Sequence, residues 1–399
     1  MIDGVIDEAW LLAETADNFN MVLPMDTSKS LVKTAVKMSY DNEHLYLIAI
    51  CYYKPDQAYM VESLKRDFVF GKNDNFLLFM DPFDDQTNGF SFGSNAAGAQ
   101  WDGIMYDGGK VDLNWDNKWS SAVKNYQDKW IWEAAIPFKT IRYKNGIKTW
   151  GINFSRLDIT MAEKSSWAPV PRQFPTATLA YSGQLIWDEP PPEAGTNISM
   201  IPYVLTSGSK NYSAGTKNVF KKEIGLDAKI GITSSLNLDL TVNPDFSQVE
   251  VDRQVTNLDR FELFFPERRQ FFLENGDQFS NFGYAGIRPF FSRRIGLNVP
   301  IQFGARLSGK LNKDWRIGLM NMQTGENPAN KTLAQNYTVF ALQRRVFARS
   351  NIGLLVVNRD QVLWGKKDAS LMTNPFNRNI GIEYNLASAN NLWTGKAVL

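Results

Sequence analysis

Histidine and cysteine are almost absent from this 399-residue chain, and their scarcity excludes several classes of protein. Cys51 is the only cysteine, so the chain cannot form an internal disulfide. His44 is the only histidine, which disfavours zinc hydrolases with paired imidazole ligands and also Ser-His-Asp enzymes. An excess of positive charge is lacking too, because 43 basic side chains stand against 42 acidic ones. We therefore expect no nucleic-acid partner.

Long apolar runs are also missing. The longest, residues 45–53, is well short of the roughly 20 apolar residues that a membrane-spanning helix needs. The first residues lack the basic and then apolar pattern of a secretory leader. Taken literally, these features indicate a cytoplasmic protein. The organisation of the chain leads instead to the expectation of a fragment that is missing a leader and further strands.

The two halves of the chain carry opposite charge. Residues 1–192 hold 18 basic and 25 acidic side chains, net −7, whereas residues 193–399 hold 25 and 17, net +8. The triple proline at 190–192 favours an extended spacer, which is typical of a domain boundary. We therefore predict a first domain at 1–187, a Pro-rich linker at 188–197 and a second domain at 198–399.

The first domain consists of short apolar or alternating runs separated by turn residues. Residues 32–38 alternate as a half-buried strand does, and residues 45–53 are apolar on both faces. Dipeptides such as Asn88-Gly89 and Asn145-Gly146 separate further runs. This pattern predicts an antiparallel β-sandwich that resembles a jelly roll.

The second domain shows longer and cleaner alternation. Apolar residues take every second position over residues 224–232 and again over 236–242, and similar segments recur from 301 to the end of the chain. Segments of about ten alternating residues are typical of a transmembrane β-barrel, whereas soluble strands are nearer five or six residues. The fold-class prediction is therefore all-β: a sandwich followed by an antiparallel transmembrane β-barrel that is truncated here. A large soluble antiparallel sheet is the alternative.

Residues 245–294 interrupt the strand pattern with seven Arg, no Lys, eight acidic residues and ten Phe. Residues 252–266 are predicted to form a short helix with Asp252 at its N-cap and Pro266 at its end. Arg in place of Lys favours planar pairing with carboxylates inside a crowded site. We expect an insert that plugs or narrows the barrel lumen, with an anion site or an exposed loop as alternatives. Its candidate arginines are Arg253, Arg260, Arg268, Arg269, Arg293 and Arg294.

Several blocks of sequence resemble known families. Residues 3–10 (DGVIDEAW), 39–47 (SYDNEHLYL) and 134–138 (AAIPF) resemble three successive blocks of family 9 carbohydrate-binding modules. Residues 240–250 and 264–274 are similar to an uncharacterised outer-membrane β-barrel family, typical of Bacteroidota-like bacteria, that carries such a module in front. The resemblance implies an exported precursor with a longer barrel. It also implies an outer-membrane location, with the N-terminal domain in the periplasm.

The resemblance implies a glycan ligand, and sugars are bound by aromatic faces with a few polar groups around them. Trp119, Trp130, Trp132 and Trp150 are predicted to lie in the core. Trp101, Trp115 and Trp167 lie among Gly, Asp, Asn and Pro and are the predicted sugar-binding residues, in apparent loops.

The remaining candidates for chemistry are carboxylates. Asp81, Asp84, Asp85 and Asn88 form an acidic loop that could supply oxygen ligands to calcium, although the spacing is not that of an EF-hand. A glycosidase needs two carboxylates about 5 to 10 Å apart. Asp102, Asp107, Glu133 and Asp158 are available, but no spacing selects a pair, so no catalytic residue is assigned.

The combined prediction is a non-enzymatic outer-membrane protein that acts in glycan binding, uptake or envelope assembly. Its expected partners are a glycan, the lipid bilayer and other outer-membrane proteins. The alternative is a polysaccharide-degrading hydrolase of O-glycosyl bonds, or its accessory subunit.

Overall fold

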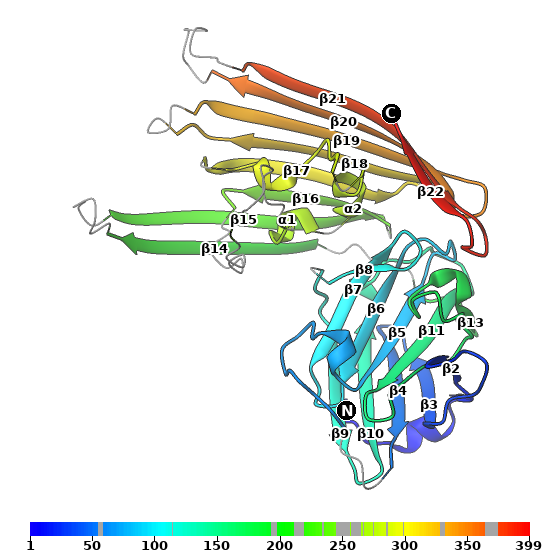
Figure 1. Cartoon of the computed structure of the whole chain (residues 1–399). Helices are drawn as coiled ribbons and strands as arrows, with labels where there is room; N and C mark the ends of the chain where they lie inside the picture. The colour runs from blue at the N-terminus through cyan, green and yellow to red at the C-terminus, as the bar shows by residue number, and fades with distance from the viewer. Residues whose placement is uncertain are drawn as a thin grey trace. The chain divides into compact units, whose positions relative to one another are not determined.

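The computed structural model describes most of the chain as antiparallel strands with a few short helices. The described residues are 1–54, 59–113, 115–192, 198–210, 219–233, 235–244, 256, 265, 267–273, 275–284, 286–297, 299–327, 332–363 and 374–399. The chain divides into two compact units (Figure 1). Unit 1 is Met1–Gly195 with Ala389–Leu392, and unit 2 is Thr196–Ser388 with Trp393–Leu399.

Unit 1 contains two antiparallel sheets. The first has the order β1 (Thr15–Ala16), β3 (Thr34–Tyr40), β4 (His44–Tyr52), β10 (Lys129–Pro137) and β9 (Ser120–Asn125). The second has the order β2 (Asn20–Leu23), β12 (Glu163–Ser166), β11 (Thr149–Asp158), β5 (Asn75–Asp81), β6 (Gly89–Asn95), β7 (Gln100–Tyr106) and β8 (Lys110–Asp112), and β13 (Gly183–Ile186) also pairs with β11.

The core of unit 1 is formed by side chains from both sheets, as in a sandwich. β4 and β10 supply Leu47 and Trp132, and β5 and β11 supply Phe76 and Phe154. Trp119, Trp130, Trp132 and Trp150 all belong to this core, as predicted. The outer face of the first sheet is covered by Trp10. The prediction of an all-β protein with an antiparallel β-sandwich is therefore confirmed.

The helical segments within the described residues are all short. They are η1 (Glu8–Leu11), η2 (Phe70–Lys72), η3 (Phe138–Thr140), η4 (Leu179–Tyr181), α1 (Gln270–Leu273), α2 (Asp277–Ser280) and η5 (Ser292–Arg294). Among the described residues, no helix is long and apolar enough to cross a membrane.

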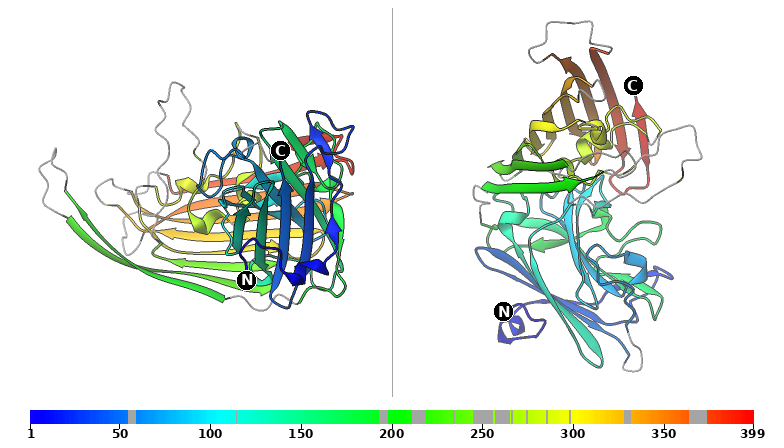
Figure 2. Two further views of the ribbon diagram at one scale, coloured as in Figure 1. Left: turned by 90° about the horizontal axis from the view of Figure 1, so that it is seen from below. Right: turned by 90° about the vertical axis from the view of Figure 1, so that its left-hand side faces the viewer.

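Unit 2 is one sheet of nine antiparallel strands in sequence order, and Figure 2 shows that the sheet is curved. Its strands are β14 (Ile198–Ser209), β15 (Val219–Thr233), β16 (Leu236–Val242), β17 (Ile301–Lys310), β18 (Trp315–Thr324), β19 (Ala334–Val346), β20 (Ser350–Val362), β21 (Phe376–Ala387) and β22 (Thr394–Val398). The described strands form an open path from β14 to β22. The predicted strands of this half are confirmed, while β14 was not predicted.

The connections of this sheet differ in length between its two ends. At the end where β14 begins, neighbouring strands are joined by the short connections 234–235, 311–314, 347–349 and 388–393. At the opposite end, the connections are 210–218, 243–300, 325–333 and 363–375. The longest of these contains α1, α2 and η5, which lie inside the curve of the sheet (Figure 2).

Candidate functional site

The three tryptophans predicted to bind sugar do not form one exposed platform. Trp101 lies in β7 rather than in a loop, and its side chain packs in a small cluster with Phe79 and Leu179. The loop assignment of Trp101 was therefore wrong, because Gly and Asp neighbours do not prevent a short buried strand. Trp115 is in a loop as expected, but only 6% of it is exposed. Trp167 follows β12, is half-buried, and packs on Phe154 with ring centroids 5.7 Å apart.

The acidic loop after β5 uses its carboxylates to shape its own backbone. Asp81 accepts hydrogen bonds from the amides of Phe83 and Asp85 at 3.1 and 2.9 Å. Asp85 accepts from the amides of Thr87 and Asn88 at 2.9 and 3.1 Å. These contacts are those of Asx turns and explain the loop without a cation. Within the described residues, no group of three or more His, Cys, Asp or Glu side chains is placed to hold a metal ion. Calcium binding by Asp81, Asp84, Asp85 and Asn88 stays a prediction.

Two of the carboxylates considered for catalysis, Glu133 and Asp107, make structural contacts. Glu133 is buried and accepts hydrogen bonds from the amides of Asp3 and Gly4 and from Nε1 of Trp10, at 2.9, 3.0 and 3.1 Å. Asp107 forms an exposed ion pair with Lys110. These contacts give Glu133 and Asp107 structural roles.

A polar cluster around Arg66 is the strongest candidate site of unit 1. The Arg66 guanidinium donates to Oδ1 of Asp102 at 2.6 Å and to Oε1 of Gln100 at 2.9 Å, and it pairs with Asp116 at 2.8 Å. Oδ2 of Asp102 accepts from the Asn117 amide at 2.7 Å. The Arg66 side chain stays 35% exposed, so the cluster is open to solvent on one side. Planar amide, carboxylate and guanidinium groups are suited to hold hydroxyls in fixed directions.

Two carboxyls have raised pKa values: Asp102 and its neighbour Asp67, which accepts a hydrogen bond from the Asp102 amide at 3.3 Å. Burial raises the pKa of Asp67 to about 7, with the nearby charge of Asp102 as a further cause. Burial likewise raises the pKa of Asp102 to about 6, although the Asn117 amide and Arg66 oppose this shift. Asp67 also has a positive φ of 55°, a conformation that costs energy for a non-glycine residue. Carboxyls that titrate near neutral pH occur more often at functional sites than elsewhere.

The sequence alone did not point to this cluster. Its members are far apart in the chain, and only the fold brings Arg66 to the end of β7. A usable signal was the alternation along β7, which places Gln100 and Asp102 on the face opposite Trp101.

In unit 2, the arginine-rich insert is described only in part. Arg253 and Arg260, with most of the helix predicted at 252–266, lie outside the described residues. Arg269 binds Glu267 through two nitrogens, at 2.8 and 2.7 Å, and Arg293 lies over the Phe265 ring at 5.7 Å.

The other candidate arginines of the insert are only partly enclosed. Arg268 is half-buried beside Arg269, and Arg294 in η5 is exposed. The Arg269–Glu267 pair is a bidentate Arg–carboxylate pair of the predicted kind.

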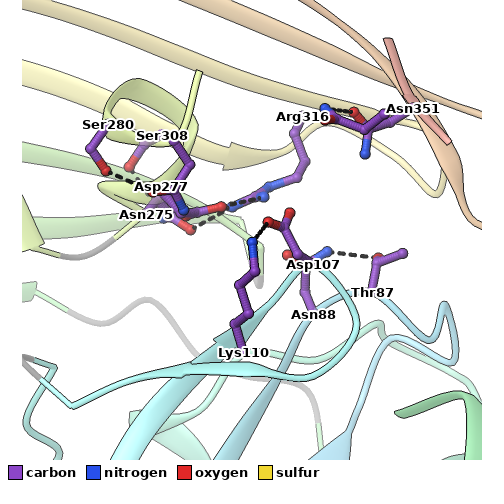
Figure 3. A network of polar contacts seen from close by, with 12 residues as sticks. Thr87, Asn88, Asp107, Lys110, Asn275, Asp277, Ser280, Ser308, Arg316 and Asn351 are labelled. Carbon is purple, nitrogen blue, oxygen red and sulfur yellow. Dashed lines mark hydrogen bonds and ion pairs between the residues drawn. The ribbon is translucent and has the colours of Figure 1, made fainter. Parts of the chain in front are cut away.

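From here on, the insert means the described residues between 267 and 297. It packs on the polar face of the sheet. Arg316 of β18 donates to both oxygens of Asp277 at 2.8 and 3.1 Å, as Figure 3 shows. Asn275 donates to Ser308 of β17 at 3.2 Å, and Glu383 of β21 accepts from the Gly283 amide at 3.0 Å. These bonds attach the insert to β17, β18 and β21.

Two glycines of the sheet provide space for phenylalanines of the insert. A Cβ added at Gly318 would lie 2.6 Å from Cζ of Phe279, and one added at Gly381 would lie 2.8 Å from Cε1 of Phe282. Both phenylalanines are buried. Each phenylalanine ring occupies the space that a side chain would fill at the glycine. The insert therefore packs at one defined position on the sheet.

The opposite face of the sheet carries an apolar row that crosses eight of its nine strands. Cross-strand pairing aligns one row of apolar residues through eight consecutive strands: Ile198, Ile230, Leu238, Leu307, Leu319, Phe340, Val356 and Ile380. Ile198, Leu319 and Ile380 in this row are 58%, 42% and 75% exposed. The polar face is thus covered by the insert, while the apolar face is uncovered at these positions. This is the reverse of an ordinary soluble sheet.

Comparisons with known families agree with this division. Residues 2–169 match the family model of the "Carbohydrate family 9 binding domain-like" domain, and residues 194–314 match a domain of unknown function (DUF5916). The N-terminal part of the chain is therefore a domain like the family 9 carbohydrate-binding modules, and a DUF5916 region follows it. No curated protein matches the chain.

Several solved structures are detectably similar to the chain. A family 9 module from Caldicellulosiruptor kristjanssonii in complex with cellotriose is 16% identical, with 47% of this chain and 89% of that chain covered and a TM-score of 0.34. A putative carbohydrate-binding protein from Bacteroides uniformis is 14% identical, with 44% and 87% covered and a TM-score of 0.36. The outer membrane channel DcaP of Acinetobacter baumannii is 8% identical, with 90% and 94% covered and a TM-score of 0.21.

Proposed function

We propose that this is an outer-membrane protein in which unit 2 is part of a lipid-embedded β-barrel and unit 1 is a periplasmic glycan-binding domain. Its role is glycan capture, uptake or envelope assembly. The observation that carries the membrane half is the apolar row through eight strands, opposite a polar face that the insert covers. An apolar face of this width is stable in contact with acyl chains, whereas in water it would favour aggregation.

The connection lengths support the proposed topology. Bacterial outer-membrane barrels have short periplasmic turns and longer extracellular loops. Unit 2 has the same asymmetry, and β14 starts at the end with the short connections. The chain that precedes β14, including unit 1, is therefore assigned to the periplasmic side.

Glycan binding by unit 1 is supported by the match of residues 2–169 to the family 9 carbohydrate-binding domain. The Arg66 cluster offers the polar groups that such a ligand needs. Stacking on one ring, over roughly 50 Å², gives only about 1.3 kcal/mol at about 25 cal/mol per Å². Millimolar affinity requires about 4 kcal/mol. Hydrogen bonds must therefore supply much of the affinity, and those to charged groups contribute about 1.5–3 kcal/mol each.

Calorimetric titration of the full-length protein with a panel of oligosaccharides, cellotriose among them, tests this proposal. We expect at least one saccharide to bind with millimolar or better affinity. Replacing Arg66 with methionine should weaken this binding by about tenfold or more, because one charged donor is worth about 1.5–3 kcal/mol.

Lys72→Met is the matched control, since Lys72 forms only an exposed pair with Glu62. The affinity of the Lys72→Met variant for the saccharide should equal that of the parent. Failure of every saccharide to bind at millimolar concentration would refute glycan binding. Equal affinities of the Arg66 variant and the parent would exclude the Arg66 cluster as the site.

A further inference from the structure

The apolar face of the unit 2 sheet becomes polar along a single line across four adjacent strands. On the apolar side of this line, the paired residues of β18, β19, β20 and β21 are Leu319, Phe340, Val356 and Ile380. Two residues further toward the long connections, the paired residues on the same face are Asn321, Thr338, Asn358 and Arg378. Four neighbouring strands thus change from apolar to polar between the same two rows of pairs.

The polar row contains two hydrogen-bonded pairs and is partly exposed. Asn321 donates to Oγ1 of Thr338 at 2.8 Å, and Nε of Arg378 donates to Oδ1 of Asn358 at 3.0 Å. Asn358 in turn donates to Asp360 at 2.6 Å. The Arg378 side chain remains 66% exposed. An arginine on the lipid face is far more costly at the bilayer midplane than near the interface.

Aromatic residues lie beyond both ends of the apolar segment. Phe376 is 58% exposed, and the Arg378 guanidinium lies over its ring at 4.7 Å. Toward the short connections, cross-strand pairs link Trp315 to Tyr384 through Arg344 and Ile352. The Arg344 guanidinium lies over the Trp315 ring at 5.3 Å. Aromatic girdles flank the apolar band of membrane barrels. The six steps from Arg378 to Tyr384 measure about 20 Å along the strand, which for a strand tilted by about 40° corresponds to about 15 Å of depth, less than the usual band of about 25 Å.

We propose that the hydrocarbon core of the bilayer ends between these two rows, and that Asn321, Thr338, Asn358 and Arg378 contact the polar headgroup layer. The inference rests on the proposed membrane location of unit 2. It adds the position along the strands at which the hydrocarbon core meets the headgroup layer. The binding partners are lipid phosphates and the water around them, because Arg378 and the side-chain amides can donate hydrogen bonds to phosphate oxygens. The leaflet is the one at the end of the sheet with the long connections.

Spin-label accessibility in the full-length protein tests this boundary, after reconstitution into phosphatidylcholine and phosphatidylglycerol vesicles. Single cysteines are placed as two matched pairs, Val356→Cys with Asn358→Cys and Phe340→Cys with Thr338→Cys. Burial raises the pKa of the Cys51 thiol to about 12, so the native cysteine stays unlabelled. The readout is collision with oxygen, which concentrates in hydrocarbon, and with a polar nickel chelate, which stays in water.

Labels at 356 and 340 should collide mainly with oxygen, and labels at 358 and 338 mainly with the nickel chelate. The members of a pair should differ in depth by about 5 Å, given two residues on a tilted strand. Leu355→Cys is the control, because Leu355 is buried under the insert and should be protected from both reagents.

The outcomes separate this inference from the proposed function. Oxygen-dominated collision at all four positions would overturn the boundary while leaving the membrane location intact. Protection of labels at 358 and 338 from both reagents would mean that protein covers the polar row. This result would also overturn the proposed boundary. Nickel-dominated collision at 356 and 340 would refute the membrane location itself.

Discussion

Replacing Gly318 with valine is expected to undock the insert and raise the ion conductance of the protein in planar bilayers. Even a Cβ at this position would lie 2.6 Å from Phe279, and valine adds two methyl groups. Overpacking of this kind costs about 1–3 kcal/mol. That free energy shifts the ratio of undocked to docked insert by about 5- to 150-fold. In the proposed barrel, the undocked insert no longer narrows the lumen, so open channels should be more frequent.

The control is Gly286→Ala, because a Cβ at Gly286 meets nothing within 4 Å although the residue lies in the insert. Its conductance should equal that of the parent. Adding Phe279→Ala to the Gly318 variant should return the conductance toward the parental value, since the clash is then relieved. A Gly318 variant that conducts as the parent does, with the insert equally resistant to protease, would contradict the plug interpretation.

Replacing Arg156 with methionine should destabilise unit 1 by about 3–5 kcal/mol, the usual cost of removing one partner from a buried ion pair. Arg156 is 2% exposed and donates to the Lys33 carbonyl at 2.9 Å, to the Thr34 hydroxyl at 3.1 Å and to the Tyr52 carbonyl. It also pairs with Asp158 at 3.2 Å. Without the guanidinium, each of these acceptors loses one hydrogen-bond donor, and the buried Asp158 carboxylate loses its cation.

Urea unfolding followed by tryptophan fluorescence measures this effect, because nine of the twelve tryptophans precede residue 193. Arg172→Met is the control, since Arg172 is exposed, and its stability should remain within about 0.5 kcal/mol of the parent. A loss of less than about 1 kcal/mol in the Arg156 variant would mean that the buried network contributes little to the sandwich.

The strands of unit 2 could be predicted from the sequence because each has a polar face and an apolar face. Residues 236–242 show this most clearly, with Asn237, Asp239 and Thr241 buried and the residues between them more exposed. β14 was missed because Pro202 and the short alternation around it resemble a linker. β7 was missed for a related reason, since its Asp and Gly residues suggest a turn.

The candidate sites were harder to predict than the strands. Arg66 meets Asp102 only because β7 pairs within the second sheet of unit 1, and Phe279 meets Gly318 only because the insert folds back on the sheet. Contacts between distant segments leave no periodic signal in the chain. The composition of the insert indicated tight packing with paired arginines, but it did not indicate which strands receive the phenylalanines.

Photolabelling with a diazirine-bearing phospholipid is the most direct test of the central claim that the apolar face of unit 2 touches acyl chains. The full-length protein is reconstituted, irradiated and digested, and labelled residues are located by mass spectrometry. On β20 we expect label at Leu354 and Val356 and little at Leu355 and Val357, which are buried under the insert. Equal labelling of both faces, or no label on this strand, would contradict the account.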